Sequence, residues 1–146
     1  MTEERVMGVD YGEKRVGLSL SDPLGFTAQP LTSLPRKNDG QIASELENIT
    51  REHEVKRLVV GLPLKLSGAD SARTRRTRRF IEHLRRRLKM PVENWDERLS
   101  TTEAERALRD LALSGQRRKA IRDVTSAQLI LQGYLDRRRI ESPKPA

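Results

Sequence analysis

Two short apolar segments, separated by only three residues, constrain the fold of this chain more than any other feature. The segments RVMGVDY (5–11) and RVGLSLS (15–21) have the apolar runs and alternation that are typical of buried β-strands. Residues 12–14, Gly-Glu-Lys, are short enough for a tight hairpin turn. The pattern therefore predicts an antiparallel hairpin at the start of the chain.

The rest of the sequence continues with strand and helix patterns. They predict, in order, a short strand near 26–34 interrupted by Pro30, a helix over 40–53, a strand over 57–62, a helix over 70–88, a strand over 92–96, a helix from Ser100 to Leu113 ended by Gly115, and a last helix from Ile121 to Arg138. This order is typical of an α/β fold with a mixed five-stranded sheet flanked by helices. We expect a single domain over residues 1–140 and a short tail over 141–146.

Positive charge is concentrated in one predicted helix. The chain has 29 Lys and Arg against 21 Asp and Glu, a net charge of +8, and residues 71–90 alone hold nine basic residues and one acid. Arginine suits phosphate because its planar guanidinium donates paired hydrogen bonds. Since only 3% of residues are aromatic, base stacking is disfavoured, and contacts to backbone phosphates are expected. A solvated helix face is the alternative. The candidate contacts are Arg73, Arg75, Arg76, Arg79, Arg117, Arg118 and Lys119.

Several classes of protein are disfavoured by composition. There is no cysteine, so disulfides, thiolate zinc sites and thiol nucleophiles are excluded. No apolar run approaches the length of a membrane span, and the acidic N-terminal residues do not resemble a secretory signal. We therefore expect a cytoplasmic protein with no membrane partner. His53 and His83 are expected at the surface, without a zinc or catalytic-triad pattern.

Acidic residues at three places are candidates for a catalytic site. Asp10 lies within an apolar strand, where a carboxylate is costly to bury unless it is paired or binds a metal. Asp96 and Glu97 close the strand over 92–96, and Asp123 opens the last predicted helix on its buried face. Each has a simpler explanation: a hydrogen bond to the turn for Asp10, and the helix dipole for the others.

Taken together, the three positions favour a metal site. Mg²⁺ and Mn²⁺ prefer oxygen ligands, and carboxylates from separate elements can hold two ions. Two such ions about 4 Å apart can activate water and stabilise the leaving oxygen in phosphodiester hydrolysis. An acidic site repels a polyanion, so the arginines would supply the attractive field. The acids and the basic helix are thus explained by one hypothesis.

Four motifs give the chain a specific resemblance to the YqgF family. They occur in the family's order and span about residues 5–137: MGVDYGEKRVGLSLSDPLGFTAQPL, VVGLPLKLSG, WDERLSTTEAERAL and AQLILQGYLD. Members are described as pre-16S rRNA nucleases and as Holliday-junction-resolvase-like (RuvX) proteins. The resemblance implies an RNase H-like fold and metal-dependent phosphodiester cleavage at a group of acidic residues.

The resemblance also assigns roles to individual residues. The acid of the family's first strand corresponds to Asp10, the acid of its DER motif to Glu97, and the acid of its last helix to Asp123. Asp96 matches the neighbouring aspartate of that motif, either as an assisting or as a structural residue.

Two further points of the resemblance concern substrate contacts. Lys14 and Arg15 match the family's basic pair after the first turn and are expected at the substrate. Two departures stand out: the family often has alanine three residues after its last acid, where this chain has Ser126, and residues 71–79 are denser in arginine than is typical of the family.

Three functions follow as hypotheses. The first is an Mg²⁺- or Mn²⁺-dependent nuclease that processes the 5′ end of precursor 16S rRNA, acting as a monomer or weak homodimer. The second is a Holliday junction resolvase acting on branched DNA, which would need a dimer to cut both strands. The third is a non-catalytic nucleic-acid-binding protein, whose acids would serve only as caps and turn residues.

Overall fold

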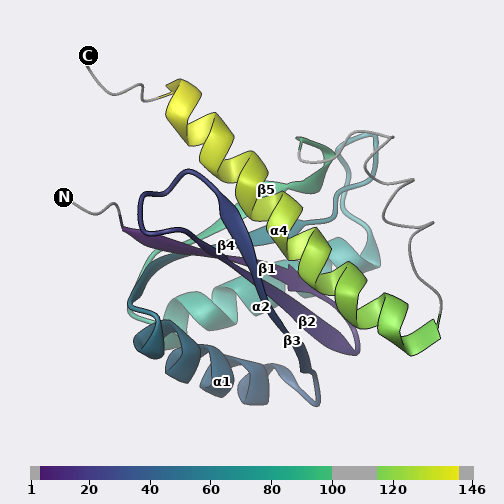
Figure 1. The fold of residues 1–146 in the computed structure, drawn as a ribbon. Helices are drawn as coiled ribbons and strands as arrows, with labels where there is room; N and C mark the ends of the chain where they lie inside the picture. Colours follow the sequence, from purple (N-terminus) through teal and green to yellow (C-terminus); the bar gives the residue numbers. More distant parts are fainter. Residues whose placement is uncertain (1–3, 100–114, 142–146) are drawn as a thin grey trace.

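The protein folds around a five-stranded mixed sheet. The computed structural model describes residues 4–99 and 115–141, and side chains over 4–99 and 124–139. The elements are β1 (Arg5–Tyr11), β2 (Arg15–Ser21), β3 (Ala28–Pro35), α1 (Asp39–Glu52), β4 (Val55–Leu62), α2 (Ala72–Arg87), β5 (Val92–Asp96), the 3₁₀ turn η1 (Glu97–Leu99) and α4 (Gly115–Glu141). The sheet order is β3-β2-β1-β4-β5 (Figure 1).

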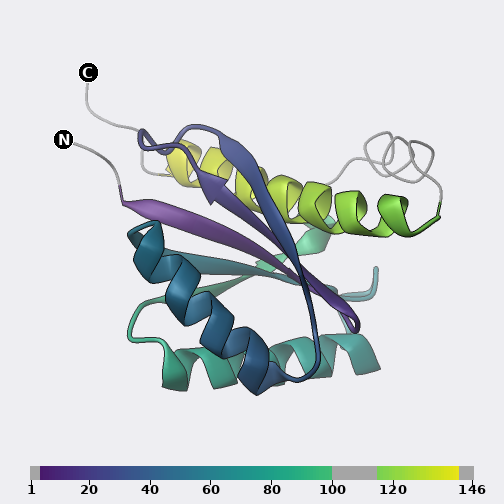
Figure 2. The same ribbon diagram turned by 60° about the horizontal axis from the view of Figure 1, so that its bottom comes forward.

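The elements form three layers. Helix α4 crosses one face of the sheet, and α1 and α2 cover the opposite face (Figure 2). Each face has its own apolar cluster, because β1 and β4 direct alternate side chains to opposite sides. Met7, Val9 and Tyr11 belong to the cluster beneath α1 and α2, whereas Val6 packs with residues of α4. The predicted α/β fold with a mixed five-stranded sheet is therefore confirmed.

The N-terminal hairpin has the predicted bounds. Strands β1 and β2 pair antiparallel, with Asp10 opposite Gly17. The Gly12 amide donates to the Arg15 carbonyl at 2.9 Å and closes the turn. That amide is therefore satisfied by the hairpin itself.

Strand β3 lies at the edge of the sheet, where the predicted proline can be accommodated. Pro30 pairs with Ser19 next to a register shift in β2. Proline has no amide hydrogen, so it is tolerated at an edge or a bulge and not in a central strand. The edge is partly covered by α4: the Gln132 side chain accepts from the Ala28 amide at 2.9 Å, and Gln128 donates to the Ala28 carbonyl at 3.0 Å.

Helix α2 keeps its arginines at the surface because its buried stripe continues through two threonines. Phe80 and Leu84 are fully buried, as the apolar spacing predicts. Thr74 and Thr77 are fully buried as well, and their hydroxyls are satisfied by the carbonyls of Pro63 and Arg73. Short polar side chains that bond to backbone can therefore extend a buried helix face where no apolar residue is present.

Helix α4 approaches the sheet closely because the residues at the crossing are small. The Ser19 hydroxyl on β2 donates to the Ala127 carbonyl at 2.7 Å. A Cβ atom on Gly8 would lie 2.4 Å from Ser19 Oγ, 2.7 Å from the Ala127 oxygen and 2.8 Å from Leu131 Cβ. Only glycine fits at this position of β1, so Gly8 sets the distance between helix and sheet.

Two sequence predictions need correction here. Helix α4 begins at Gly115 and not at Ile121, because residues 116–120 (QRRKA) have high helix propensity even though they lack apolar spacing. Gly115 is thus the first residue of α4, and the helix predicted over 100–113 lies outside the described residues. His83 is half-buried in α2, and its Nε2 is buried without a hydrogen-bond partner in the described part of the chain, so it is not a surface histidine.

The crossing predicts a large cost for one added methyl group. Gly8→Ala should lower the free energy of unfolding by about 2–3 kcal/mol, because the new Cβ overlaps backbone and side-chain atoms of α4 and β2. Urea denaturation measures this difference. Gly40→Ala, in the first turn of α1, is the matched control and should change stability by less than about 1 kcal/mol. Equal stability of the two variants would contradict the close-packing argument.

Candidate active site

Asp10 lies near the carboxyl end of β1, on the sheet face that α4 covers. It shares this face with Val6 and Gly8, as the period-two pattern predicts, and is 8% exposed. The strands β1, β4 and β5 run parallel, so their carboxyl ends meet at one edge of the sheet. Asp10 is therefore a nearly buried carboxylate at the edge where residues following β4 and β5 also emerge.

Glu97 is brought to the same face by the strand between them. The register pairs Val9 with Val60, so Gly61 follows next to Asp10. A Cβ on Gly61 would lie 3.1 Å from both Cγ and Cδ of Glu97, and 2.4 Å from Ile130 Cδ1 of α4. The Glu97 side chain therefore lies over Gly61, one strand away from Asp10, since neighbouring strands are about 4.8 Å apart.

Asp123 is placed only through its backbone. It lies within α4, four and seven residues before Ala127 and Ile130, which pack on the sheet. Its side chain lies outside the described residues, so its role as a third ligand stays a prediction. Since α4 begins at Gly115, Asp123 is the ninth residue of the helix. The helix-dipole explanation does not apply there, because that effect fades beyond the first turn.

Asp96 differs from its neighbour Glu97 in its partner. Both of its carboxylate oxygens accept from the Arg98 guanidinium, at distances of 2.7–3.0 Å. The Arg98 guanidinium, and then the Arg98 amide, hold the pKa of Asp96 below its ordinary value. Arg98 also donates to the Leu66 carbonyl at 3.2 Å and so ties the loop after β4 to the end of β5. The Asp96–Arg98 pair thus lies between the end of β5 and the loop after β4, as the structural alternative for Asp96 predicts.

A cation from the basic helix reaches the buried acid. Arg73, in the first turn of α2, places Nη2 3.8 Å from Asp10 Oδ1. Beside this pair is a hollow of about 380 Å³, lined by the hairpin turn and by Arg36, Arg73 and Arg76. Sequence reasoning included Arg73 and Arg76 as substrate contacts, but it missed Arg36 because no charge run marks that position.

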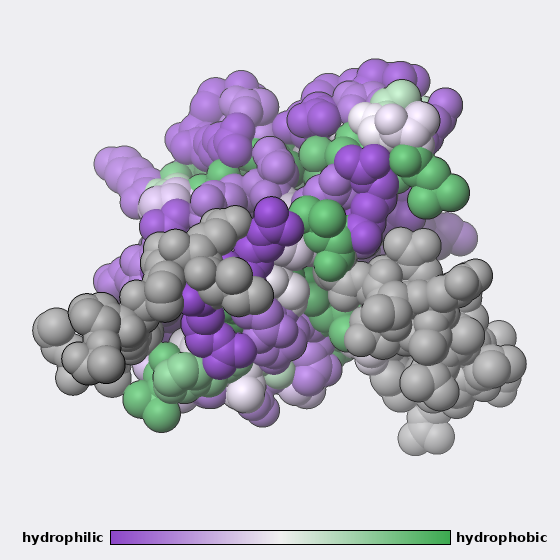
Figure 3. All heavy atoms as spheres, turned by 90° about the horizontal axis from the view of Figure 1, so that it is seen from above, coloured by the Kyte–Doolittle hydropathy of each residue, from purple (hydrophilic) through white to green (hydrophobic). Residues whose placement is uncertain are grey.

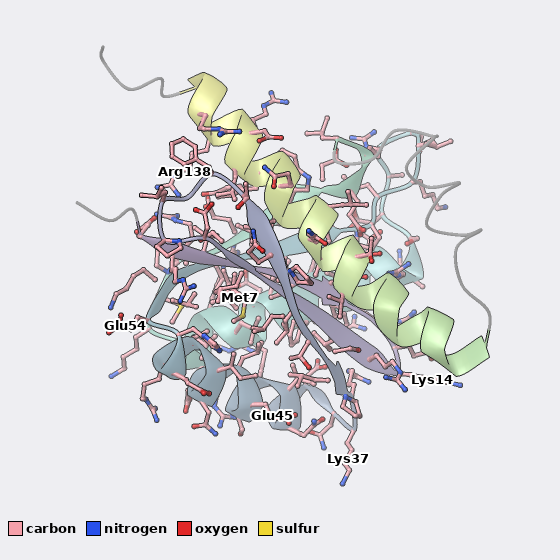
Figure 4. The ribbon with its side chains drawn as sticks, viewed as in Figure 1. Met7, Lys14, Lys37, Glu45, Glu54 and Arg138 are labelled. Atoms are coloured by element: carbon pink, nitrogen blue, oxygen red, sulfur yellow. The ribbon has the colours of Figure 1, made fainter. Side chains whose placement is uncertain are left out.

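The other predicted substrate contacts lie on exposed surface where they are described. Lys14 is exposed at the tip of the hairpin (Figure 4). Arg15 is half-buried. Arg75 and Arg79 project from α2 and form no ion pair with a carboxylate in the described residues. The side chains of Arg117, Arg118 and Lys119 fall outside the described ranges.

The hairpin turn is held by a small polar network. Tyr11 donates its hydroxyl hydrogen to Asp39 at 2.7 Å and stacks on Phe80. Arg36 donates to the same Asp39 oxygen and to the Glu13 carbonyl. These contacts join the end of β1 to the start of α1 and fix the backbone that carries Asp10. The network was not predicted, because its members come from segments that are unrelated in sequence.

The donor chemistry at this edge fits a hard divalent cation. Asp10 and Glu97 offer carboxylate oxygens on one face, and such oxygens are the ligands that Mg²⁺ and Mn²⁺ prefer. Over residues 4–99 and 124–139, no three acidic or histidine side chains gather closely enough to hold an ion. Position 123 is outside those ranges, so the set of three predicted ligands is not tested.

Comparison with known sequences assigns the family. The profile of the family described as "RuvX: Holliday junction resolvase" matches residues 4–137. The chain belongs to the RuvX family. RuvX relatives named "Putative pre-16S rRNA nuclease" are similar over nearly their whole length. The Koribacter versatilis protein is 44% identical over 141 residues, which cover 97% of this chain and 92% of that protein. The Syntrophomonas wolfei protein is 45% identical over 132 residues, which cover 90% and 94%.

Solved structures confirm the fold of this RuvX-family chain. Thermus thermophilus RuvC in complex with a Holliday junction substrate superposes with a TM-score of 0.66 and 13% identity, covering 99% of this chain and 100% of that one. A second RuvC structure from the same organism gives a TM-score of 0.59 at 13% identity, with 97% and 99% coverage. The predicted RNase H-like fold is therefore confirmed.

The turn network predicts an unusual titration. Burial first, and the Asp39 carboxylate next, raise the pKa of Tyr11 to about 12; burial and Glu93 do the same for Tyr134. These are the two tyrosines of the chain. Ultraviolet titration of the folded protein should therefore show little tyrosinate at pH 10 and a transition near pH 12. A midpoint near pH 10 for either tyrosine would contradict the burial and carboxylate contacts described for that residue.

The raised pKa values also fix the sign of the stability change. A group whose pKa is raised on folding stabilises the fold fully below its unfolded pKa, here about 10, and this contribution is lost as pH rises through 12. Asp39→Asn should lower the pKa of Tyr11 and leave the pKa of Tyr134 unchanged. Glu93→Gln should lower the pKa of Tyr134 and leave the pKa of Tyr11 unchanged.

Proposed function

We propose that this RuvX-family protein is a divalent-cation-dependent nuclease that processes the 5′ end of precursor 16S rRNA in the cytoplasm. The observation that carries the proposal is the placement of Asp10 and Glu97 on one face of the sheet, at the edge where parallel strands end. The names of relatives that are 44–45% identical support the choice of substrate.

Residues of three kinds would act at this site: metal ligands, residues that position them, and arginines that bind the substrate. Asp10 and Glu97, with Asp123 as the proposed third ligand, would hold Mg²⁺ or Mn²⁺. When bound, such ions supply a Lewis acid that stabilises charge on the reacting phosphate. Asp10 is positioned by the hairpin and by the Tyr11 network, whereas Glu97 is positioned by Gly61. The exposed arginines of α2 would bind the backbone on either side of the reacting bond.

The surface agrees with a polyanionic partner. Hydrophilic residues dominate the face in Figure 3, and hydrophobic residues form smaller patches on it. None of the helices in the described ranges has the length and apolar character that a membrane crossing requires. A mainly hydrophilic surface is compatible with the proposed binding of a nucleic acid through its phosphates.

Branched DNA is the second candidate substrate. The family's description as a Holliday junction resolvase is the specific observation in its favour. Single-turnover cleavage of precursor 16S rRNA and of a four-way DNA junction, each with Mg²⁺ or Mn²⁺, separates the two. Paired cuts in the junction, together with a dimeric mass in solution, would favour the resolvase.

The acidic site predicts a separation of cleavage from binding. Asp10→Asn and Glu97→Gln should each slow cleavage at least 100-fold, because a neutral amide is a poor ligand for a divalent cation. Their affinity for RNA should be unchanged or higher, because each substitution removes a negative charge. Gel-based cleavage and fluorescence anisotropy measure the two effects.

A surface acid supplies the control. Glu52→Gln, exposed at the end of α1, should leave cleavage within twofold of the wild type. Cleavage by Asp10→Asn at the wild-type rate would refute the proposed site. Absence of cleavage by the wild type on both substrates would favour the non-catalytic binding protein.

The basic helix predicts a change in salt dependence. Arg75→Ala and Arg79→Ala should each reduce the slope of log affinity against log salt by about 0.7–0.9, the value for one phosphate contact. Arg51→Ala, exposed on the last turn of α1, removes the same charge from another surface and should leave the slope nearly unchanged. If all three variants kept the slope of the wild type, the bound nucleic acid would lie away from α2.

A further inference from the structure

The ion pair between Asp10 and Arg73 joins two side chains in different environments. Asp10 is nearly buried, while the Arg73 side chain is 53% exposed. Their closest atoms are 3.8 Å apart, which is within ion-pair range but too long for a hydrogen bond. Arg73 is therefore held to Asp10 by charge and not by the directional bonding of a two-point arginine–carboxylate pair.

A second binding place for Arg73 lies beside this pair. The hollow next to the hairpin turn is lined by Arg36, Arg73 and Arg76, together with Tyr11, Gly12 and Glu13 of the hairpin. Arg36 is fixed by Asp39 at 2.8 Å. Arg76 forms no ion pair with a carboxylate in the described residues. The hollow can therefore present guanidinium donors to a phosphate group.

Electrostatic repulsion would link the Asp10–Arg73 pair to the hollow beside the hairpin turn. A divalent cation at Asp10 would repel a guanidinium whose nitrogen lies only 3.8 Å from the same carboxylate. The side chain of Arg73 is exposed, starts from the first turn of α2 and already lines the hollow, so its guanidinium can turn from Asp10 to a phosphate there without a change in the helix. Cation binding at Asp10 would then release Arg73 to bind a phosphate.

We propose that Arg73 exchanges partners: it pairs with Asp10 in the cation-free protein, and on cation binding it leaves Asp10 and, with Arg76, binds a backbone phosphate of the nucleic acid in the hollow that both arginines line. Arg73 is then a positioning residue that couples the metal site to substrate binding. This inference rests on the proposed function, because it requires a cation at Asp10. The competing explanation is a permanent pair that only offsets the cost of burying Asp10.

Cation affinity without substrate is the first test. Calorimetric titration of Mn²⁺ into the metal-free full-length protein should show about tenfold tighter binding for Arg73→Ala than for the wild type, because the competing cation is gone. Arg51→Ala removes the same charge from the last turn of α1 and should bind Mn²⁺ within twofold of the wild type. Asp10→Asn should bind it at least tenfold more weakly.

RNA affinity with and without a divalent cation is the second test. Fluorescence anisotropy with a short RNA hairpin should show that Arg73→Ala loses more affinity in Ca²⁺ than in EDTA, because in EDTA the wild-type arginine is already engaged by Asp10. Arg76→Ala should lose the same factor in both conditions. Gel analysis after each titration establishes that the RNA is intact.

The outcomes separate the inference from the function beneath it. Unchanged Mn²⁺ affinity in Arg73→Ala, or equal loss of RNA affinity in Ca²⁺ and EDTA, would overturn the partner exchange while leaving the nuclease proposal in place. Equal Mn²⁺ affinity of the wild type and Asp10→Asn would overturn both. Circular dichroism and thermal unfolding of each variant exclude loss of folding as the cause.

Discussion

The close approach of α4 to the sheet is the constraint on which the site depends. Gly8, Ser19 and Ala127 meet where the helix crosses β1 and β2, and no larger side chain fits at Gly8. This contact fixes the height of α4 above the face that carries Asp10. It also places Ile130 against Gly61, next to the side chain of Glu97. Packing of small residues thus sets the position of the acids.

Charge of both signs is explained by one arrangement. The acids lie on the sheet face beneath α4, where β1 and β5 end, whereas the arginines of α2 project from the opposite layer. Arg73 joins the two groups because the start of α2 lies at the same edge of the sheet as Asp10. A polyanion attracted to α2 would thereby meet the acidic site. Net charge indicates only that the partner is a polyanion. The positions of the arginines and the acids indicate how a bound polyanion would reach the acidic site.

Much of the fold could be predicted because short-range patterns were unambiguous. Strands β1, β2 and β5 have the predicted bounds, since alternation and tight turns leave little freedom of register. The predicted start of the last helix at Ile121 is wrong, because residues 116–120 favour a helix without having apolar spacing. The buried faces of Thr74 and Thr77 were missed because their burial depends on carbonyls from Pro63 and Arg73.

The sequence alone determined the strands, the face of the sheet that holds Asp10, the basic helix and the family motifs, because each follows from local spacing and composition. Only the tertiary structure decided that Glu97 lies over Gly61, that Asp96 is paired with Arg98, and that Arg73 reaches Asp10. These contacts depend on strand order and on how closely α4 packs. Both arise from residues far apart in the chain, and no local pattern encodes them.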